Sequence, residues 1–228
     1  MARQMRAVRT RDALVESAAA LFDRDGFDVA SLAAVSARAG VSSGALNFHF
    51  PSKVELAEAV VAAAAERLVR IIRDREAPTL QSVIDASHDL VRGLRGDAVL
   101  RAGFALSGCR RARRRCDAAG DGPGTDLRRL WCGWVESVVA RAEREGQLAP
   151  DVTAEEVTET VVAVATGHAV LGTQDPRWLE GAPLTRFWAL LLPRVVGAAR
   201  AGLFVAAGAR GPEPLHPRPV AVTVGGEV

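Results

Sequence analysis

The sequence contains no tyrosine, only three cysteines and no long uninterrupted apolar run. The cysteines, Cys109, Cys116 and Cys132, are odd in number, and their spacings match neither a CxxC metal knuckle nor a secreted disulfide framework, which indicates free thiols in a reducing compartment. The sequence has no run of about 18 uncharged apolar residues and no apolar segment behind a basic amino terminus. We therefore predict that it has no membrane span and no signal peptide. We therefore expect a cytoplasmic protein with no membrane partner.

An excess of charge of one sign is also lacking. The formal net charge is +2 over 228 residues, so binding of the whole molecule to a polyanion is excluded unless charges cluster locally. Two clusters exist: the first eleven residues contain four arginines and no acid, and residues 110–115 contain five arginines. We interpret the second run as a solvated loop, with a second anion contact as the alternative.

Sequence motifs of enzymes are missing. There is no glycine loop of the P-loop or dinucleotide-binding type, no HExxH and no GxSxG, and no Cys–His pair stands at a catalytic spacing. We expect no enzymatic activity, no cofactor and no metal site.

Strand signals are almost absent, whereas helical periodicity recurs along the chain, which predicts an all-α protein. Leu14, Ala18 and Phe22 form one apolar face of a helix that begins near Arg6 and ends at Gly26. Further helices are predicted over 32–39, 42–49, 52–77, 79–95, 97–109, 125–146, 153–173 and 183–205. The last two are apolar on more than one face, so we expect each to be buried against its own core and against a partner chain.

Start signals support the early helices. Ser31 and Ser42 can cap the two short ones, and Ser52 with Glu55 three residues later forms a capping box for the long one that follows. Two short helices on either side of Gly40, after an N-terminal helix, are typical of a helix-turn-helix, whose second helix enters a DNA major groove. Gly40 suits the tight turn because it has no Cβ.

This motif predicts which of its residues form a small core and which face DNA. The small core that fixes the two helices comprises Leu32, Val35, Val41, Leu46 and Phe50, with Phe48 as a second aromatic anchor. The N-terminus of the recognition helix favours phosphate, and the Ala45 methyl can meet a thymine methyl. Predicted contacts to double-stranded DNA are Arg3, Arg6, Thr10, Ser42, Ser43, Gly44, Ala45, Asn47, His49 and Lys53.

We therefore expect a helix-turn-helix DNA-binding domain over residues 1–51 and a second helical domain over 52–205. Residues 206–228 are rich in Gly and Pro, which is typical of a disordered tail.

The segment "RDALVESAAALFDRDGFDVASLAAVSARAGVSSGALNFHFPSKVELAEAV", residues 11–60, closely resembles the N-terminal domain of TetR-family transcriptional repressors. More narrowly, the opening residues, "GALNFHFPSK" and "VLRAGFALS" are similar to the gamma-butyrolactone autoregulator receptors of filamentous antibiotic-producing bacteria. The resemblance implies a homodimer whose C-terminal domain binds a small hydrophobic effector and then releases DNA.

The resemblance also implies a pocket. Trp131 falls where these receptors carry a tryptophan that covers the bound lactone, and an aromatic ring with an N–H donor suits such a ligand. The other candidates for the pocket are Phe104, Val135, Val138, Val164 and His168, followed by Trp134, Trp188 and Trp178. Each tryptophan could instead be an ordinary core residue, and His168 could be a satisfied core or interface histidine.

The sequence departs from these receptors in its recognition helix. Where they commonly read Thr-Lys-Gly-Ala-Leu-Tyr, this chain has Ser42, Ser43, Gly44, Ala45, Leu46 and Asn47. Loss of the lysine removes a phosphate contact and should flatten the salt dependence of binding by about one unit of slope.

Three kinds of regulator remain open. One is a repressor released by a butyrolactone and controlling secondary metabolism, and another is a repressor without an effector. The third is a pseudo-receptor that answers to an antibiotic or intermediate, a group that is often basic, and the pI of 8.7 leans that way.

Overall fold

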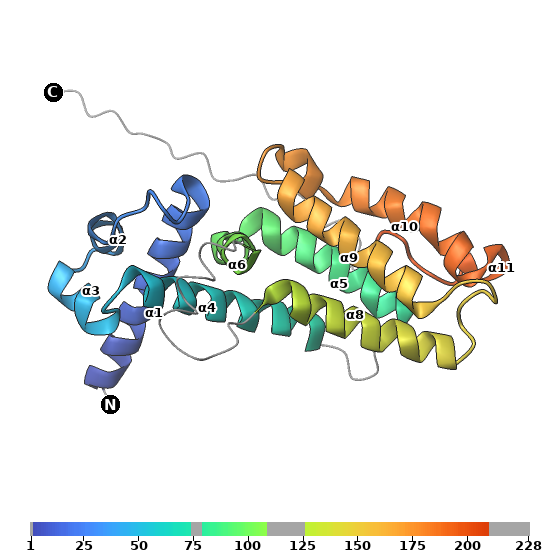
Figure 1. The fold of residues 1–228 in the computed structure, drawn as a ribbon, viewed down its shortest axis with the longest axis horizontal. Coiled ribbons are helices and arrows are strands. Elements are labelled where there is room, and N and C mark those ends of the chain that lie inside the picture. Colours follow the sequence, from blue (N-terminus) through green and yellow to red (C-terminus); the bar gives the residue numbers. More distant parts are fainter. Residues whose placement is uncertain (1, 74–78, 109–125, 210–228) are drawn as a thin grey trace, which may run out of the picture.

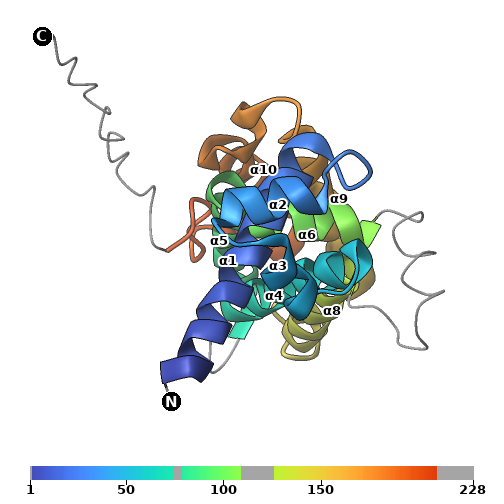
Figure 2. The same cartoon turned by 90° about the vertical axis from the view of Figure 1, so that its left-hand side faces the viewer.

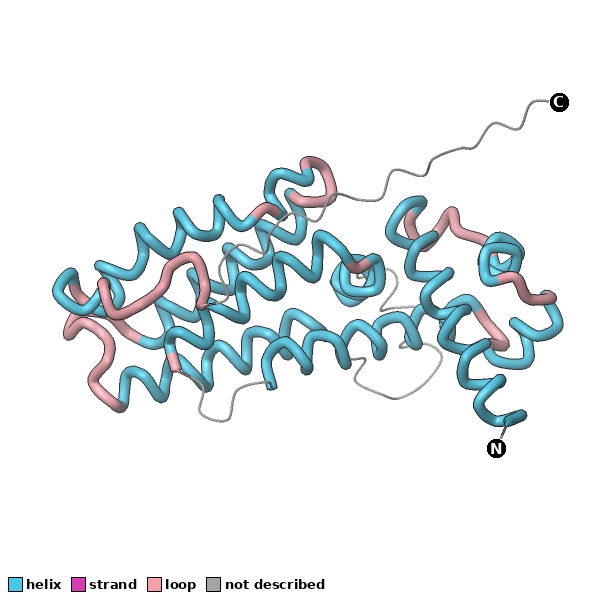
Figure 3. Tube along the Cα trace, turned by 180° about the vertical axis from the view of Figure 1, so that it is seen from behind, coloured by secondary structure: helices cyan, strands magenta, loops and turns pink. Residues whose placement is uncertain are grey.

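A computed structural model of the protein describes residues 2–73, 79–108 and 126–209. The helices in these ranges are α1 (Ala2–Asp25), α2 (Leu32–Ala39), α3 (Ser43–His49), α4 (Lys53–Arg73), α5 (Leu80–Gly96), α6 (Ala98–Gly108), α8 (Leu127–Arg144), α9 (Ala154–Leu171), the 3-10 helix η1 (Pro176–Leu179), α10 (Gly181–Val196) and α11 (Ala198–Ala201). No strand occurs in this part of the chain (Figure 3), which confirms the prediction of an all-α fold.

The described helices form two groups. Helices α1, α2 and α3 lie at one end of an elongated molecule, and α5, α8, α9 and α10 lie at the other, with α4 reaching from the first group into the second (Figure 1). Helix α6 stands between them, where it packs against α1, α4 and α8. The arrangement places one small domain on a larger helical domain.

Local capping builds the small domain as the sequence predicts. The Ser31 hydroxyl accepts the Ala34 amide at 3.1 Å, and the Ser42 hydroxyl accepts the Ala45 amide at 3.2 Å. Gly40 has φ = 67°, a left-handed conformation in which a side chain would be strained. Both short helices therefore begin and end within one residue of the predicted positions.

The core of the small domain contains Val35, Leu46 and Phe50, with Leu32 and Val41 packed partly buried against it. The expectation for Phe48 is wrong, because its side chain is 82% exposed. Leu46 and Phe50 are four residues apart and share the buried face of α3, so Phe48, about 200° around the helix from Leu46, points away from the core.

Helix α4 joins the two domains. Its start is capped as predicted, because the Ser52 hydroxyl accepts the Glu55 amide and donates to the Glu55 carboxylate, both at 3.1 Å. Further along, α4 crosses α6 so closely that a Cβ added to Gly103 would lie 2.2 Å from the Cβ of Ala64. The two backbones approach this far because these residues have almost no side chain.

The larger domain is built around α5, whose residues are buried along most of its length. The single helix predicted over 183–205 is wrong in one respect: α10 ends at Val196, where Gly197 takes φ = 82°, and α11 follows as a separate short helix. Helix η1 between α9 and α10 was not predicted.

Residues 205–209 cross α5 as a C-terminal strap. Gln81 exchanges two hydrogen bonds with the backbone of Val205, His88 Nε2 donates to the Ala206 carbonyl at 2.9 Å, and the Asp85 carboxylate accepts the Ala209 amide at 2.7 Å. Ala206 and Ala209, at the start of the segment expected to be a tail, are therefore hydrogen bonded to α5. Residues 210–228, the arginine run at 110–115, Cys109 and Cys116 lie outside the described residues.

Candidate nucleic-acid interface and effector core

Helix α3 presents its outer face at the end of the molecule that Figure 2 turns toward the viewer. Ser42, Ser43, Gly44 and Asn47 are exposed there, and Ala45 and His49 are half-buried, as is usual for residues at the edge of a docking face. The Ser42 hydroxyl uses a lone pair for the Ala45 amide, so its O–H remains able to donate to phosphate. The fold thus brings six of the predicted DNA contacts onto one short helix and its cap.

The N-terminal turns of α1 project sideways from the small domain (Figure 2). Arg6 and Arg9 are exposed on them, and Thr10 is half-buried. The side chain of Arg3 lies outside the described residues. These turns carry positive charge past the small domain, which suits contact with a phosphate backbone.

Lys53, also a predicted DNA contact, is engaged within the domain. Its ammonium donates to the Asp28 carbonyl at 3.1 Å and lies 4.8 Å from the centroid of the Phe27 ring. These contacts fix the start of α4 against the loop after α1.

Two further aromatic contacts shape this surface. The rings of Phe48 and His49 meet edge to face with centroids 5.3 Å apart, and the Arg11 guanidinium lies 5.3 Å above the Phe50 ring. Sequence reasoning placed Phe48 in the core and left Arg11 out of the set of contacts. Only the cluster of N-terminal arginines could have pointed to Arg11.

The larger domain buries most of the predicted effector residues. Trp131 is 2% exposed, and Val135 and Val138 follow it on the same face of α8, which packs against α6 and α9. Phe104 is buried on α6, and Val164 on α9 is half-buried. These residues come from α6, α8 and α9, and α8 packs against both of the others.

Three buried polar atoms in this domain have no hydrogen-bond partner among the described residues: Trp131 Nε1, Trp188 Nε1 and Thr158 Oγ1. Such atoms are unusual, because an unmet buried donor costs about 1–3 kcal/mol. Thr158 was missed by sequence reasoning. Its signal was a hydroxyl beside Val157 and Val161, on the apolar face of α9.

His168 has a partner of its own. Its Nδ1 donates to the Trp178 carbonyl, and its ring meets the Trp178 indole edge to face with centroids 5.9 Å apart. This pair ties α9 to η1, which favours the structural alternative for His168. Trp178 itself is 41% exposed on η1.

In the part of the chain that the structure describes, no helix combines the length and apolarity needed to cross a bilayer. No group of His, Cys, Asp and Glu in these residues is arranged to hold a metal ion. Cys132, half-buried on α8, is a free thiol.

Comparison with known proteins finds relatives of similar sequence and fold. Residues 14–60 match the family model for bacterial regulatory proteins of the tetR family. The chain is 28% identical over 199 residues to the A-factor receptor protein of Streptomyces griseus, an alignment that covers 86% of this chain and 67% of that protein.

Two solved structures extend the likeness over most of the fold. One is a gamma-butyrolactone receptor described as an ArpA-like protein, with a TM-score of 0.72 and 26% identity over 90% of this chain and 97% of that chain. The other is CprB from Streptomyces coelicolor in complex with its biological operator sequence, with a TM-score of 0.71 and 28% identity over the same shares of the two chains.

Residues 14–60 therefore carry a DNA-binding domain of the tetR family, and the described fold as a whole is of the TetR type. Over most of its length the chain is similar to the gamma-butyrolactone receptors.

Proposed function

We propose that the protein is a ligand-responsive transcriptional repressor. It binds a pseudo-palindromic operator as a homodimer, is released by a small hydrophobic signal of the gamma-butyrolactone type, and acts in the cytoplasm on genes of secondary metabolism. The observation that carries the proposal is the set of three buried polar atoms without a described partner, Trp131 Nε1, Trp188 Nε1 and Thr158 Oγ1.

These atoms match the chemistry of a lactone. A ring carbonyl accepts a hydrogen bond from an indole N–H, and a hydroxyl on the ligand can bond the threonine hydroxyl. An apolar tail would lie against buried residues such as Phe104, Val135 and Val138. Each satisfied donor recovers part of the cost of its burial, which favours the liganded state.

The DNA-binding half of the proposal is supported by the exposed face of α3 and by the likeness to CprB bound to its operator. Dimerisation is supported by apolar residues on the outer faces of α9 and α10, where Leu190 is 82% and Val170 is 50% exposed. A second copy would cover them, since apolar surface of this kind marks an interface. The dimer would set its two recognition helices about 34 Å apart, or at a related spacing, to read both half-sites.

Release of DNA requires that the ligand bind the released conformation more tightly than the DNA-bound one. To move the population from 1:99 to 99:1, the ligand must bind the released state more tightly by about 5.5 kcal/mol. An enclosed apolar site with a few polar groups can provide such a difference. In this proposal the movement passes through α4, which reaches from one domain into the other.

A second candidate is a pseudo-receptor that answers to an antibiotic or a biosynthetic intermediate. The pI of 8.7 favours it, because pseudo-receptors are often basic. A repressor without an effector is a third candidate, which a filled and dry core behind Trp131 would favour.

A gel-shift titration tests these candidates. The purified full-length protein is titrated onto DNA from its own upstream region, alone, with synthetic butyrolactones, and with lipid extract from the producing culture. Release by a butyrolactone is the expected result. Release only by another component of the extract would favour the pseudo-receptor, and binding that nothing relieves would favour the repressor without an effector.

A further inference from the structure

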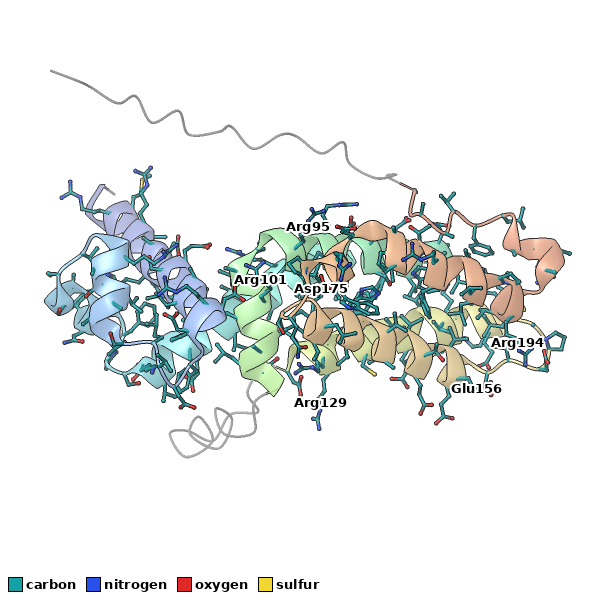
Figure 4. All side chains as sticks on the ribbon, turned by 90° about the horizontal axis from the view of Figure 1, so that it is seen from above. Arg95, Arg101, Arg129, Glu156, Asp175 and Arg194 are labelled. Carbon is teal, nitrogen blue, oxygen red and sulfur yellow. The ribbon has the colours of Figure 1, made fainter. Side chains whose placement is uncertain are left out.

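One arginine binds both domains across their junction. Arg101, on α6, donates through Nε and Nη2 to both carboxylate oxygens of Asp23 on α1, at 2.8 to 3.1 Å. Its Nη1 donates to the carbonyls of Leu94 and Arg95, at 2.7 and 3.0 Å, near the end of α5. Figure 4 labels Arg101 at the boundary between the two groups of helices.

The environment of this pair makes it stronger than an ordinary surface ion pair. The side chains of Arg101 and Asp23 are 24% and 22% exposed, so solvent screens them only in part. The contact is bidentate, which adds geometric specificity to the charge interaction. Because Arg101 also holds the last carbonyls of α5, a shift of the corner between α5 and α6 acts directly on Asp23.

A second ion-pair network lies beside the first. Arg67 on α4 is bonded to Glu16 on α1 and to Asp97. Asp97 in turn accepts the amide of Val99 at 2.8 Å and so caps the start of α6. Three helices, α1, α4 and α6, therefore meet through charged side chains at one place.

Apolar packing continues from one domain to the other, and an open surface cleft lies beside it. This cleft, of about 800 Å³, is lined by Ser17 and Ala20 on α1, Arg38 on α2 and Ala98 on α6, and Arg67 borders it. Because apolar contacts have little directional preference, the polar contacts at the junction add a defined geometry to this packing. Helix α6 is held on its other side, where Gly103 meets Ala64 of α4.

We propose that the Arg101–Asp23 pair is the latch that makes the small domain follow α6. The proposal rests on the proposed function and adds a second connection between the domains, from α6 to α1, to the one through α4. Asp23 lies near the end of α1, and about 26 Å of continuous helix connects it to Arg6 at the DNA-facing end. A small displacement at the latch is therefore carried along a rigid helix to the DNA-facing surface.

The structural alternative is that the pair only adds stability. Linkage separates the two roles, because coupling is reciprocal: if α6 controls the docking surface, then DNA binding must change α6. Loss of a purely stabilising pair would alter the melting temperature without altering that transmission.

The test is hydrogen–deuterium exchange of the full-length protein, with and without an operator duplex selected by binding from a random library. In the wild type, DNA should slow amide exchange in α3 and also in α6. In Asp23→Asn and Arg101→Gln, slowing in α3 should remain while slowing in α6 falls by at least roughly twofold. Asp23→Glu keeps the carboxylate and should restore the wild-type response.

Arg141→Gln is the matched control, since it removes an exposed Arg–carboxylate pair with Glu145 on α8, away from the junction. It should leave the slowing in α6 unchanged. Melting curves identify any variant that does not fold. If Asp23→Asn does not fold, Arg101→Gln carries the test, and slowing of α6 equal to that of the wild type in a folded Arg101→Gln protein would overturn the latch.

The outcomes are distinguishable. Equal slowing of α6 in the wild type and in a folded Asp23→Asn protein would overturn the latch, as would a wild type that binds DNA with no change in α6. A wild type that binds no duplex at all would overturn the proposed function, and the latch with it.

Discussion

The indole rings of Trp131 and Trp134 lie 5.4 Å apart on α8, with their planes tilted by 37°. They differ in surroundings: Trp131 is buried and its Nε1 has no partner among the described residues, whereas Trp134 is half-buried. The pair therefore provides a test of the effector site together with an internal control.

Trp131→Phe should weaken the response to a butyrolactone by about tenfold or more, because it removes one hydrogen-bond donor and keeps an apolar ring. DNA affinity without ligand should be unchanged. The measurement is the butyrolactone concentration needed for half release in a gel shift. Trp134→Phe is the control and should respond like the wild type; the reverse pattern would contradict the assignment of Trp131.

Gly103→Ala should destabilise the protein by about 1–3 kcal/mol, because the new methyl group would overlap the Cβ of Ala64. The sign is diagnostic, since a Gly-to-Ala change inside a helix otherwise stabilises by about 1 kcal/mol. Urea denaturation measures the effect. Gly133→Ala on α8, where no atom lies within 4 Å of the added Cβ, should be neutral or stabilising.

The double variant Gly103→Ala with Ala64→Gly completes this test. It returns the space that the added methyl group needs, so it should recover part of the lost stability. If both single variants and the double variant behave additively, the close crossing of α4 and α6 is not the cause.

Ser43→Lys should restore a phosphate contact at the start of the recognition helix. Ser43 is exposed there, so the longer side chain can reach the backbone of the operator. A plot of log affinity against log salt should become steeper by about one unit. Ser137→Lys, on the exposed side of α8, adds the same charge away from α3; parallel lines for Ser43→Lys and Ser137→Lys would contradict the prediction.

The stability of the protein should fall in weak acid through His88. Burial lowers the pKa of His88 and the nearby Arg92 lowers it further, while its hydrogen bond to the Ala206 carbonyl and the carboxylates of Asp85 and Asp89 act in the opposite direction. Since the unfolded chain then binds the proton more tightly than the folded protein, the free energy of unfolding decreases as the pH falls through and below about 6.5.

Urea midpoints at about pH 8 and about pH 5.5, on either side of the ordinary histidine pKa, measure this dependence. His88→Gln keeps a donor for Ala206 and removes the titration, so it should lose less stability over the same interval. An equal loss in both proteins would show that other groups are responsible.

Much of the small domain was predictable because its signals are local. Ser31, Gly40 and Ser42 act on backbone groups three or four residues away, so the sequence around them is enough to place α2, the turn and α3. The same holds for the start of α4 at Ser52 and Glu55. The candidate DNA-contact residues of α3 followed from this local placement.

The sequence-based predictions were wrong where the same pattern of residues is compatible with two arrangements. Phe48 is as apolar as Phe50, and only the direction in which α3 docks decides which of them is buried. Around Gly197 the chain reads as helix on both sides, and the positive φ that ends α10 appears only in the folded protein.

By itself, then, the sequence determined the helical class and the helix-turn-helix with its caps and turn. Tertiary structure decided the rest, because it joins residues that no short-range pattern connects: Arg101 meets Asp23 from 78 residues away, and Ala209 reaches Asp85 across 124 residues. Such contacts depend on how whole helices pack, and packing is a property of the complete core rather than of any segment.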